Sequence, residues 1–282
     1  MAINLELPKK MLAVAEKGHQ GAVNIIRPIS RKYDLAEHAY PVELDTIAAL
    51  FEGIQEANTG GNFAGATDAF RGDTGKNGEK VNVNGGNMSA LLNALEVSWG
   101  DVAMLLSVPY QGLGNAAISS VATDEQLARL GKVWAAMAIT EPSFGSDSSA
   151  VSTTATLDGD EYVINGEKIF VTAGSRATHI VVWATLDKSK GRAAIKSFIV
   201  PREHPGVTVE RLEEKLGIKA SDTAVIRFDN ARIPKDNLLG SPDIDVEKGF
   251  GGVMETFDNT RPMVAAMASA SRVPRSRNSA RS

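Results

Sequence analysis

The sequence predicts an α+β fold, with an all-α N-terminal part, a middle β-barrel and a helix that returns near the C-terminus. Three observations predict this order. Apolar residues recur at helical spacing up to about residue 131. Short apolar or alternating runs, separated by turn residues, then continue to about residue 240. Helical spacing resumes over residues 249–268.

A long amphipathic helix is predicted over residues 8–31. Pro8 suits a helix first turn, and Pro28 is expected to kink or end the helix because proline lacks the N–H of an interior position. A second helix is predicted over residues 42–55. The apolar stripe of the first helix consists of Met11, Leu12, Ala15, His19, Ala22, Val23 and Ile26.

Residues 58–86 are rich in Gly, Asn, Asp and Thr, and they predict a long surface loop. Further helices are expected over residues 88–98 and 102–106 and in a segment after Pro109. Thr123, followed by Asp124-Glu125-Gln126, has the hydroxyl and the amide partner of a capped helix start.

Closely spaced turn residues divide the middle part into short strands, as in a small barrel. Asn165-Gly166 predicts a tight hairpin between strands over 162–164 and 168–172. The other strands are predicted over residues 135–139, 151–155, 180–183, 197–200, 207–209 and 224–228.

The C-terminal part changes character after about residue 268. Before that point, Phe250, Val253, Met254, Phe257, Val264 and Met267 predict one apolar helix face. Residues 269–282 are rich in Ser and Arg and contain no acidic residue, so they cannot continue this amphipathic pattern.

The overall composition is that of a globular chain, with 43% hydrophobic and 23% charged residues among 282. The net charge of −4 gives no reason to expect nucleic acid or an anionic membrane as a partner. Cysteine is absent, which suits a reducing compartment, and neither a signal peptide nor a membrane span is visible. A cytoplasmic location is therefore expected.

The segment 138–147, Ala-Ile-Thr-Glu-Pro-Ser-Phe-Gly-Ser-Asp, says most about function. Together with residues 168–172, it places two hydroxyls, an aromatic ring and a Gly-Ser turn at the ends of adjacent strands. A flavin needs such a surface, with an apolar wall, donors to its polar edge and open backbone for its pyrophosphate.

The chain resembles the acyl-CoA dehydrogenase family over about residues 1–268. Four motifs in the same order carry the resemblance, namely Met137–Asp147, Tyr162–Thr172, Leu216–Thr223 with Val225–Asn230 and Pro234, and Phe257–Pro262. The resemblance implies a helical domain over residues 1–131, a β-barrel over 132–240, and the first helix of a C-terminal bundle over 241–268, followed by an aberrant or disordered tail over 269–282. It also implies that the family's catalytic Glu lies in bundle helices outside this chain, so no catalytic residue is assigned.

By resemblance, the cofactor is FAD. The residues matched to its binding site are Met137, Ile139, Thr140, Gly145, Ser146, Phe170 and Thr172. Those matched to acyl-CoA binding are Ser146, Asp258 and Arg261.

Plainer interpretations of the same residues remain open. Thr140 and Thr172 could reflect only the preference of Thr for strands, and Phe170 could be an ordinary core aromatic. Asp258 and Arg261 could form a surface ion pair on one helix face. A carboxylate before proline, as in Glu141, is more often structural. None of the four histidines has a ligand-spaced partner, so no metal is assigned.

The implied function is FAD-dependent α,β-dehydrogenation of an acyl-CoA in fatty acid β-oxidation, impaired or partner-dependent in this chain. Electron-transfer flavoprotein is the implied electron acceptor, and a homo- or hetero-oligomer is expected. A second hypothesis is a non-catalytic FAD- or CoA-binding subunit of a heteromeric dehydrogenase. A third keeps the fold but changes the chemistry to that of a flavin monooxygenase or a nitroalkane-type oxidase.

Overall fold

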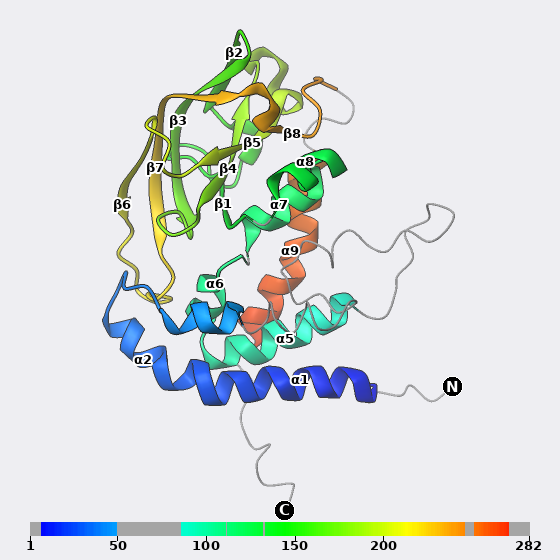
Figure 1. Cartoon of the computed structure of the whole chain (residues 1–282), viewed down its shortest axis with the longest axis vertical. Coiled ribbons are helices and arrows are strands. Elements are labelled where there is room, and N and C mark those ends of the chain that lie inside the picture. Colours follow the sequence, from blue (N-terminus) through cyan, green and yellow to red (C-terminus); the bar gives the residue numbers. More distant parts are fainter. Residues whose placement is uncertain (1–6, 50–85, 111, 132, 246–250, 271–282) are drawn as a thin grey trace, which may run out of the picture.

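Helices gather at one end of the molecule and a curled sheet at the other, as the computed structural model shows (Figure 1). The structure describes residues 7–49, 86–110, 112–131, 133–245 and 251–270. Helices α7 and α8 lie beside the sheet, and α9 runs from them toward α5. This arrangement confirms the predicted order of helices, strands and returning helix, while the domain boundaries remain predictions.

The N-terminal helices form one extended run. It consists of α1 (Lys9–Gly21), a π-helical segment (Ala22–Ile26) and α2 (Arg27–Leu35). The sequence predicts that the helix kinks or ends at Pro28. It does not end there, because Pro28 lies in the first turn of α2 and the helix continues to Leu35. Proline is tolerated in a first turn, where its missing N–H needs no partner. The π-helical segment directly before it provides the break between α1 and α2.

The remaining helices follow the sequence pattern closely. They are α5 (Gly86–Gly100), α6 (Val102–Ser107), α7 (Leu113–Val121), α8 (Asp124–Leu130) and α9 (Gly251–Ala270), and residues 43–49 are also helical. The capping box before α8 is confirmed, since Thr123 Oγ1 accepts from Gln126 N at 3.2 Å and Gln126 Oε1 accepts from Thr123 N at 3.0 Å. The loop predicted over residues 58–86 and the end of the helix predicted over 42–55 lie outside the described residues.

The strands form one sheet with the order β6-β7-β3-β2-β4-β5-β8, and β1 pairs with β4. They are β1 (Ala135–Ala138), β2 (Thr154–Asp158), β3 (Glu161–Thr172), β4 (His179–Thr185), β5 (Ile195–Pro201), β6 (Val207–Leu212), β7 (Thr223–Pro234) and β8 (Leu238–Leu239). Short 3₁₀ turns lie at Ser148–Ala150, Lys188–Ala194 and Lys235–Asn237. The pairings of β4 with β1 and β2 are parallel, and the others are antiparallel.

The hairpin predicted at Asn165-Gly166 is wrong. These residues lie inside the continuous strand β3, and the true hairpin joins β2 to β3 around Gly159, which has a φ of +64°. The pairing of β3 with β7 shifts register between Ile164 and Gly166, which marks a bulge. Asn165 Oδ1 accepts from Asn230 N of β7 at 2.8 Å. The Asn-Gly pair therefore continues the strand instead of turning, because β7 pairs with β3 on both sides of it, and the extra residue of the bulge lies opposite it in β7, where Asn230 has a φ of +48°.

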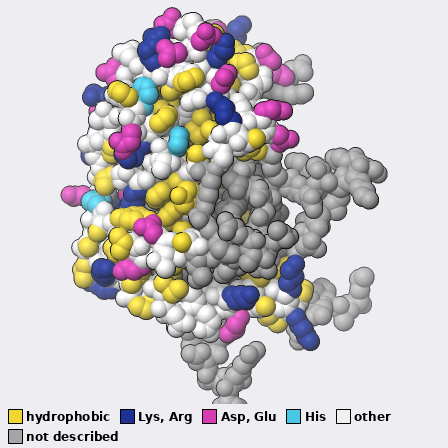
Figure 2. All heavy atoms as spheres, in the orientation of Figure 1, with side chains coloured by type: hydrophobic (Ala, Val, Ile, Leu, Met, Phe, Trp, Pro, Cys, Tyr) yellow, Lys and Arg dark blue, Asp and Glu magenta, His cyan; other side chains and the backbone are white. Residues whose placement is uncertain are grey.

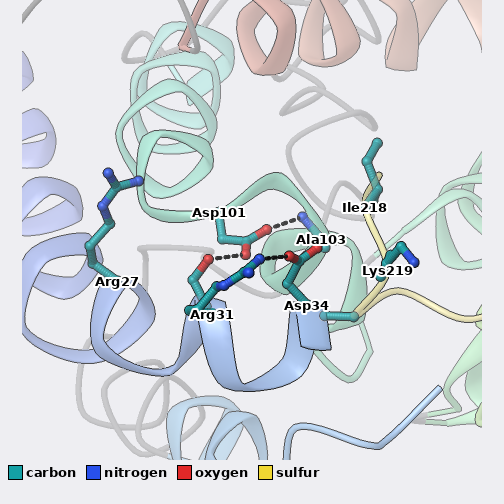
Figure 3. A pocket seen from close by; sticks show the side chains of 9 residues that line it. Arg27, Arg31, Asp34, Asp101, Ala103, Ile218 and Lys219 are labelled. Atoms are coloured by element: carbon teal, nitrogen blue, oxygen red, sulfur yellow. Dashed lines mark hydrogen bonds and ion pairs between the residues drawn. The ribbon is translucent and has the colours of Figure 1, made fainter. Parts of the chain in front are cut away.

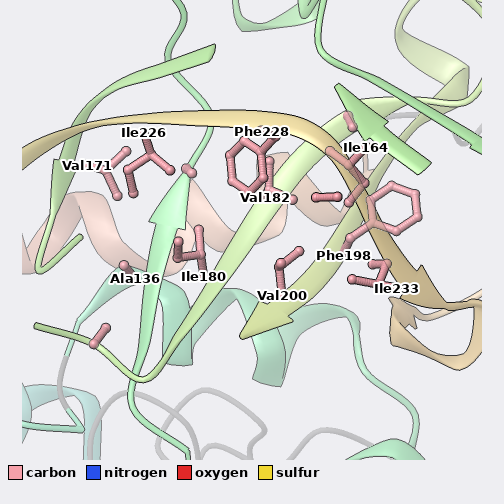
Figure 4. Close-up of a cluster of buried hydrophobic side chains, with 14 of the residues drawn as sticks. Ala136, Ile164, Val171, Ile180, Val182, Phe198, Val200, Ile226, Phe228 and Ile233 are labelled. Atoms are coloured by element: carbon pink, nitrogen blue, oxygen red, sulfur yellow. The ribbon is translucent and has the colours of Figure 1, made fainter. Parts of the chain in front are cut away.

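The largest core fills the inside of the curled sheet (Figure 4). Phe198, Phe228 and Ile164 are fully or almost fully buried there, and Phe198 meets Tyr162 edge-on at 5.0 Å. A second cluster lies between the sheet and the helices α7 and α9, where Ile118 and Val253 pack. Together these two clusters fix the ends of β1 and β3, where the predicted site lies.

The apolar face predicted for α9 is only partly buried. Val253 is 1% exposed and packs in the second cluster, whereas Met254 is 41% exposed and Val264 is 58% exposed. On the face shown in Figure 2, hydrophobic side chains gather where the sheet meets the helices, and charges of both signs are scattered over the sheet. Within the described ranges, none of the helices combines the length and apolar character of a bilayer span.

Candidate functional site

The segment that follows β1 lies against β3 at Thr140. Ile169 N donates to Thr140 O at 2.9 Å, so the second residue after β1 contacts the last part of β3. The two segments that the sequence singled out, 138–147 and 168–172, are therefore neighbours in the fold.

Phe170 sits on β3 in an unusual conformation. Its φ is +58°, and the β3–β7 register shifts between Lys168 and Val171. The ring is 60% exposed although Lys168 and Val171 are both buried. A left-handed, non-glycine residue that exposes an aromatic ring is costly on both counts, and such strain collects at functional sites. The alternative of an ordinary core aromatic is therefore wrong.

The hydroxyls of Thr140 and Thr172 are available to a ligand. Both residues are half-buried, and neither hydroxyl has a hydrogen-bond partner in the part of the chain that the structure describes. Strand preference alone accounts for Thr at these positions but not for hydroxyls left open beside Phe170.

Gly145 and Ser146 lie exposed in the loop after Thr140. A Cβ placed on Gly145 would meet nothing within 4 Å, and its backbone is not in the left-handed region, so the fold itself does not require glycine here. Glycine also serves where backbone must come close to a ligand. The exposed ring offers an apolar face, and the hydroxyls and open backbone offer hydrogen-bond donors. Together these groups fit a flavin.

Met137 and Ile139 lie differently. Their side chains are 9% and 7% exposed and pack in the second cluster. The carbonyl of Ile139 accepts from Lys168 Nζ at 3.1 Å. Only backbone groups of these two residues remain for a cofactor, and any such role stays a prediction.

A buried ion pair lies beneath this surface. Lys168 Nζ is 2.8 Å from Glu141 Oε1, with side-chain exposures of 0% and 2%. The carboxylate also accepts from the backbone N–H and the hydroxyl of both Ser152 and Thr153, at 2.5 to 2.9 Å. Glu141 is thus structural, as the plainer interpretation held.

The charges of this pair respond to burial and to each other. Burial alone would raise the pKa of Glu141. The charge of Lys168 and the hydrogen bonds that the Glu141 carboxylate accepts lower that pKa to about 2. Burial lowers the pKa of Lys168 to about 8, although Glu141 opposes this shift. Sequence reasoning missed Lys168, and the signal was a lysine in phase with the buried strand residues Tyr162 and Ile164.

Asp258 and Arg261 form the surface pair that the sequence left open. Arg261 Nη1 is 2.6 Å from Asp258 Oδ1, and the side chains are 60% and 65% exposed. The Arg261 guanidinium also lies 5.7 Å from the centre of the Phe257 ring. Contact with a CoA group stays a prediction.

Two cavities lined by described residues lie away from these positions. One of about 370 Å³ lies between α2, the start of α6 and the loop 218–220 (Figure 3). Part of its polar lining is paired internally, since Ser30 donates to Asp101 at 2.5 Å and Arg31 pairs with Asp34 at 2.7 Å. Another of about 600 Å³ is lined by Tyr40, Asp45, Ala48, Ala49, Pro109, Tyr110, Trp134, Arg176 and Thr178. No group of three or more potential metal ligands occurs within the described ranges.

Known proteins are similar in sequence to the part of the chain that forms this sheet. Residues 136–231 match the profile of the acyl-CoA dehydrogenase middle domain. The short-chain specific acyl-CoA dehydrogenase of Rattus norvegicus mitochondria is 44% identical over 131 residues, which are 46% of this chain and 31% of that protein. The chain thus spans about a third of the length of this curated relative.

Solved structures extend the likeness to the helices. The butyryl-CoA dehydrogenase of Megasphaera elsdenii superposes with a TM-score of 0.71 at 26% identity, covering 95% of this chain and 67% of that one. A glutaryl-CoA dehydrogenase from Mycobacterium smegmatis in complex with FADH2 has a TM-score of 0.72 at 23% identity, covering 94% and 62%. The order of helices, sheet and returning helix is therefore the fold of these dehydrogenases. Residues 136–231 of this chain are thus similar in sequence to the middle domain of the acyl-CoA dehydrogenase family, within a fold shared with these dehydrogenases.

Proposed function

We propose that this chain binds FAD on the surface formed by the end of β1, the loop after it and the end of β3, as part of an FAD-dependent acyl-CoA dehydrogenase. One observation carries the proposal. Phe170 is held exposed in a left-handed bulge of β3, and the hydroxyls of Thr140 and Thr172 in the adjoining segments have no hydrogen-bond partner among the described residues. The middle-domain match over the same residues supports it.

Each residue of the proposed site has a distinct task. Phe170 offers an apolar face, and Thr140 and Thr172 offer hydroxyl donors to a polar ring edge. Gly145 and Ser146 offer backbone N–H groups and a hydroxyl to a pyrophosphate. When bound, FAD supplies the oxidant that takes two electrons from the Cα–Cβ bond of an acyl-CoA.

The substrate proposal extends to the thioester. We place the acyl-CoA near Ser146 and assign recognition of its CoA part to Asp258 and Arg261, whose planar guanidinium suits phosphate. Electron-transfer flavoprotein as acceptor, an oligomeric assembly and a cytoplasmic location belong to the same proposal. The family relationship supports the first two.

Dehydrogenation also needs a base that removes a proton from Cα. Of the two carboxylates in the loop 140–150, Glu141 is buried and paired with Lys168, while Asp147 is exposed and its Oδ1 accepts from Ser149 N and its hydroxyl. Neither is assigned as this base. We therefore propose that turnover depends on residues outside this surface, and a non-catalytic subunit that binds FAD or CoA is the second candidate.

A titration of the purified chain with FAD, followed by flavin absorbance and fluorescence, tests the binding. We expect saturable binding that Phe170→Ala weakens by about tenfold or more, the scale of losing an aromatic contact. Leu157→Ala is the matched control, since Leu157 is 55% exposed on β2 and lies outside the site. Failure of the unaltered chain to bind FAD, with or without an intact homologous subunit, contradicts the proposal.

Butyryl-CoA added to the FAD complex then separates the candidates. Bleaching of the flavin band by this chain alone indicates a complete dehydrogenase. Bleaching only in the presence of an intact homologous subunit indicates the non-catalytic subunit. A stable FAD complex that butyryl-CoA neither binds nor bleaches supports the oxidase or monooxygenase chemistry instead.

A further inference from the structure

Lys168 and Glu141 form an ion pair whose two side chains are almost completely buried. The pair connects two segments that are 27 residues apart in the chain. Desolvating two charges costs about as much as their attraction returns, so a buried pair by itself is weak grounds for stability. Well-packed apolar residues would hold the sheet together equally well. The pair adds a defined loop conformation, because each of its hydrogen bonds holds one particular atom of the loop or of the residue before it.

The contacts of Glu141 close the loop that carries the proposed cofactor residues. Its two oxygens hold the backbone N–H groups of Ser152 and Thr153, which lie 11 and 12 residues further along the chain. Gly145 and Ser146 lie inside the closed segment, and Thr140 directly precedes Glu141. One carboxylate therefore fixes both ends of the loop.

The contacts of Lys168 join that loop to β3. Its ammonium group holds Glu141 Oε1 at 2.8 Å and the Ile139 carbonyl at 3.1 Å, on either side of Thr140. Lys168 is also the last paired residue before the bulge that exposes Phe170. The ion pair thus lies at the point where the loop and the strand, each with half of the proposed site, are joined.

We propose that Glu141 and Lys168 are positioning residues for the FAD site, which set the loop residues 140–146 against Phe170 and Thr172. Neither side chain touches the cofactor, since both are buried. This inference rests on the proposed function for its ligand, while the ordering of the loop can be tested without any ligand.

The test compares the unaltered chain with Glu141→Gln and with the double variant E141Q/K168M, which removes both charges. Ile233→Val is the control, because Ile233 is buried in the sheet core but lies outside the loop. We expect E141Q and the double variant to weaken FAD binding by about tenfold or more, equivalent to about 1.4 kcal/mol. Ile233→Val should leave FAD affinity unchanged although it lowers the melting temperature.

Hydrogen–deuterium exchange of the FAD-free proteins supplies the second readout. We expect faster exchange across residues 141–153 in both charge variants, with β4 and β5 unchanged. If the unaltered chain binds no FAD, the proposed function fails, and the exchange data still decide whether the pair orders the loop. Unchanged loop exchange, or unchanged FAD affinity in both charge variants, overturns the inference.

Discussion

Phe170 shows at the scale of one residue how the backbone can turn a strand position outward. A side chain with a Cβ in the left-handed region costs about 1–2 kcal/mol, and only glycine escapes that cost. The chain carries phenylalanine there with 60% of it exposed, so little burial offsets the strain. The conformation of Phe170 therefore adds no evident stability to the fold.

Substitutions at Phe170 should therefore separate strain from function. We expect Phe170→Gly to unfold at or above the temperature of the unaltered chain, because glycine relieves the left-handed strain. Phe170→Val should be less stable by about 1 kcal/mol or more, since β-branched residues fit this region worst. Thermal unfolding followed by circular dichroism measures both. A glycine variant less stable than the valine variant would contradict the assignment of strain.

Glu141 should make stability depend on pH in the acid range. Its pKa of about 2 in the folded chain lies below the unfolded value of about 4.3, so the folded state gains stability above that value and loses it as pH falls toward 2. We expect the free energy of unfolding to fall by about 3 kcal/mol more in the unaltered chain than in E141Q/K168M across this window. Urea unfolding at a series of pH values measures it, and parallel curves for the two proteins would refute it.

At the scale of an element, β3 is a strand whose pairing with β7 shifts register twice, and the second shift redirects its side chains. Its residues Tyr162, Ile164 and Lys168 are buried in the even phase, and after the second register shift Val171 is buried in the odd phase. The first bulge has its extra residue in β7, so the buried phase of β3 continues past it, whereas the second has its extra residue in β3 and reverses that phase. Without the second bulge, Phe170 would continue the buried phase and point inward.

Gly166 lets β3 pass close to Thr153 at the first of these register shifts. A Cβ there would lie 2.4 Å from Thr153 Oγ1 and 2.8 Å from Thr153 Cα, and its φ is +152°. We expect Gly166→Ala to destabilise the chain by about 2–3 kcal/mol through this clash. Gly159→Ala, with a φ of +64° and nothing within 4 Å of the new Cβ, should cost only about 1 kcal/mol. Equal losses in chemical denaturation would show that the close approach to Thr153 is unimportant.

At the scale of the whole molecule, Arg176 ties the helices to the sheet. Its guanidinium donates to the carbonyls of Ala39 at 3.0 Å and Ala220 at 2.9 Å, and lies 5.3 Å from the centre of the Tyr40 ring. It also lies 3.5 Å from Asp222, which is 1% exposed. One side chain thus joins the segment after α2, the 220 loop and the sheet.

Removing this link should destabilise the molecule strongly. We expect Arg176→Met to cost about 3–5 kcal/mol, because it removes the cation paired with the buried Asp222. Arg232→Met is the control, as Arg232 is 45% exposed and pairs with Asp158 and Glu161 at the surface, where a loss of about 0–1 kcal/mol is expected. Urea unfolding followed by tryptophan fluorescence gives both values. Similar losses for the two variants would contradict the role of Arg176.

Local signals in the sequence were enough for much of the fold. The capping box at Thr123 formed as predicted, because its hydrogen bonds join residues three apart and need no distant partner. The apolar strands of the sheet also formed, since their pattern depends on neighbours along the chain. The order of helices, strands and returning helix followed from the same signals.

Contacts across the sheet decided the rest. Asn165-Gly166 has the local signal of a turn, yet pairing with β7 on both sides keeps it inside β3, opposite a bulge of β7. The burial of Lys168 and the exposure of Phe170 depend on that register and on Glu141, far away in the chain. A sequence pattern reports the preferences of nearby residues, whereas register and charge pairing are set by the free energy of the assembled sheet. The sequence thus named the residues of the candidate site, and only the tertiary structure determined which of them face outward.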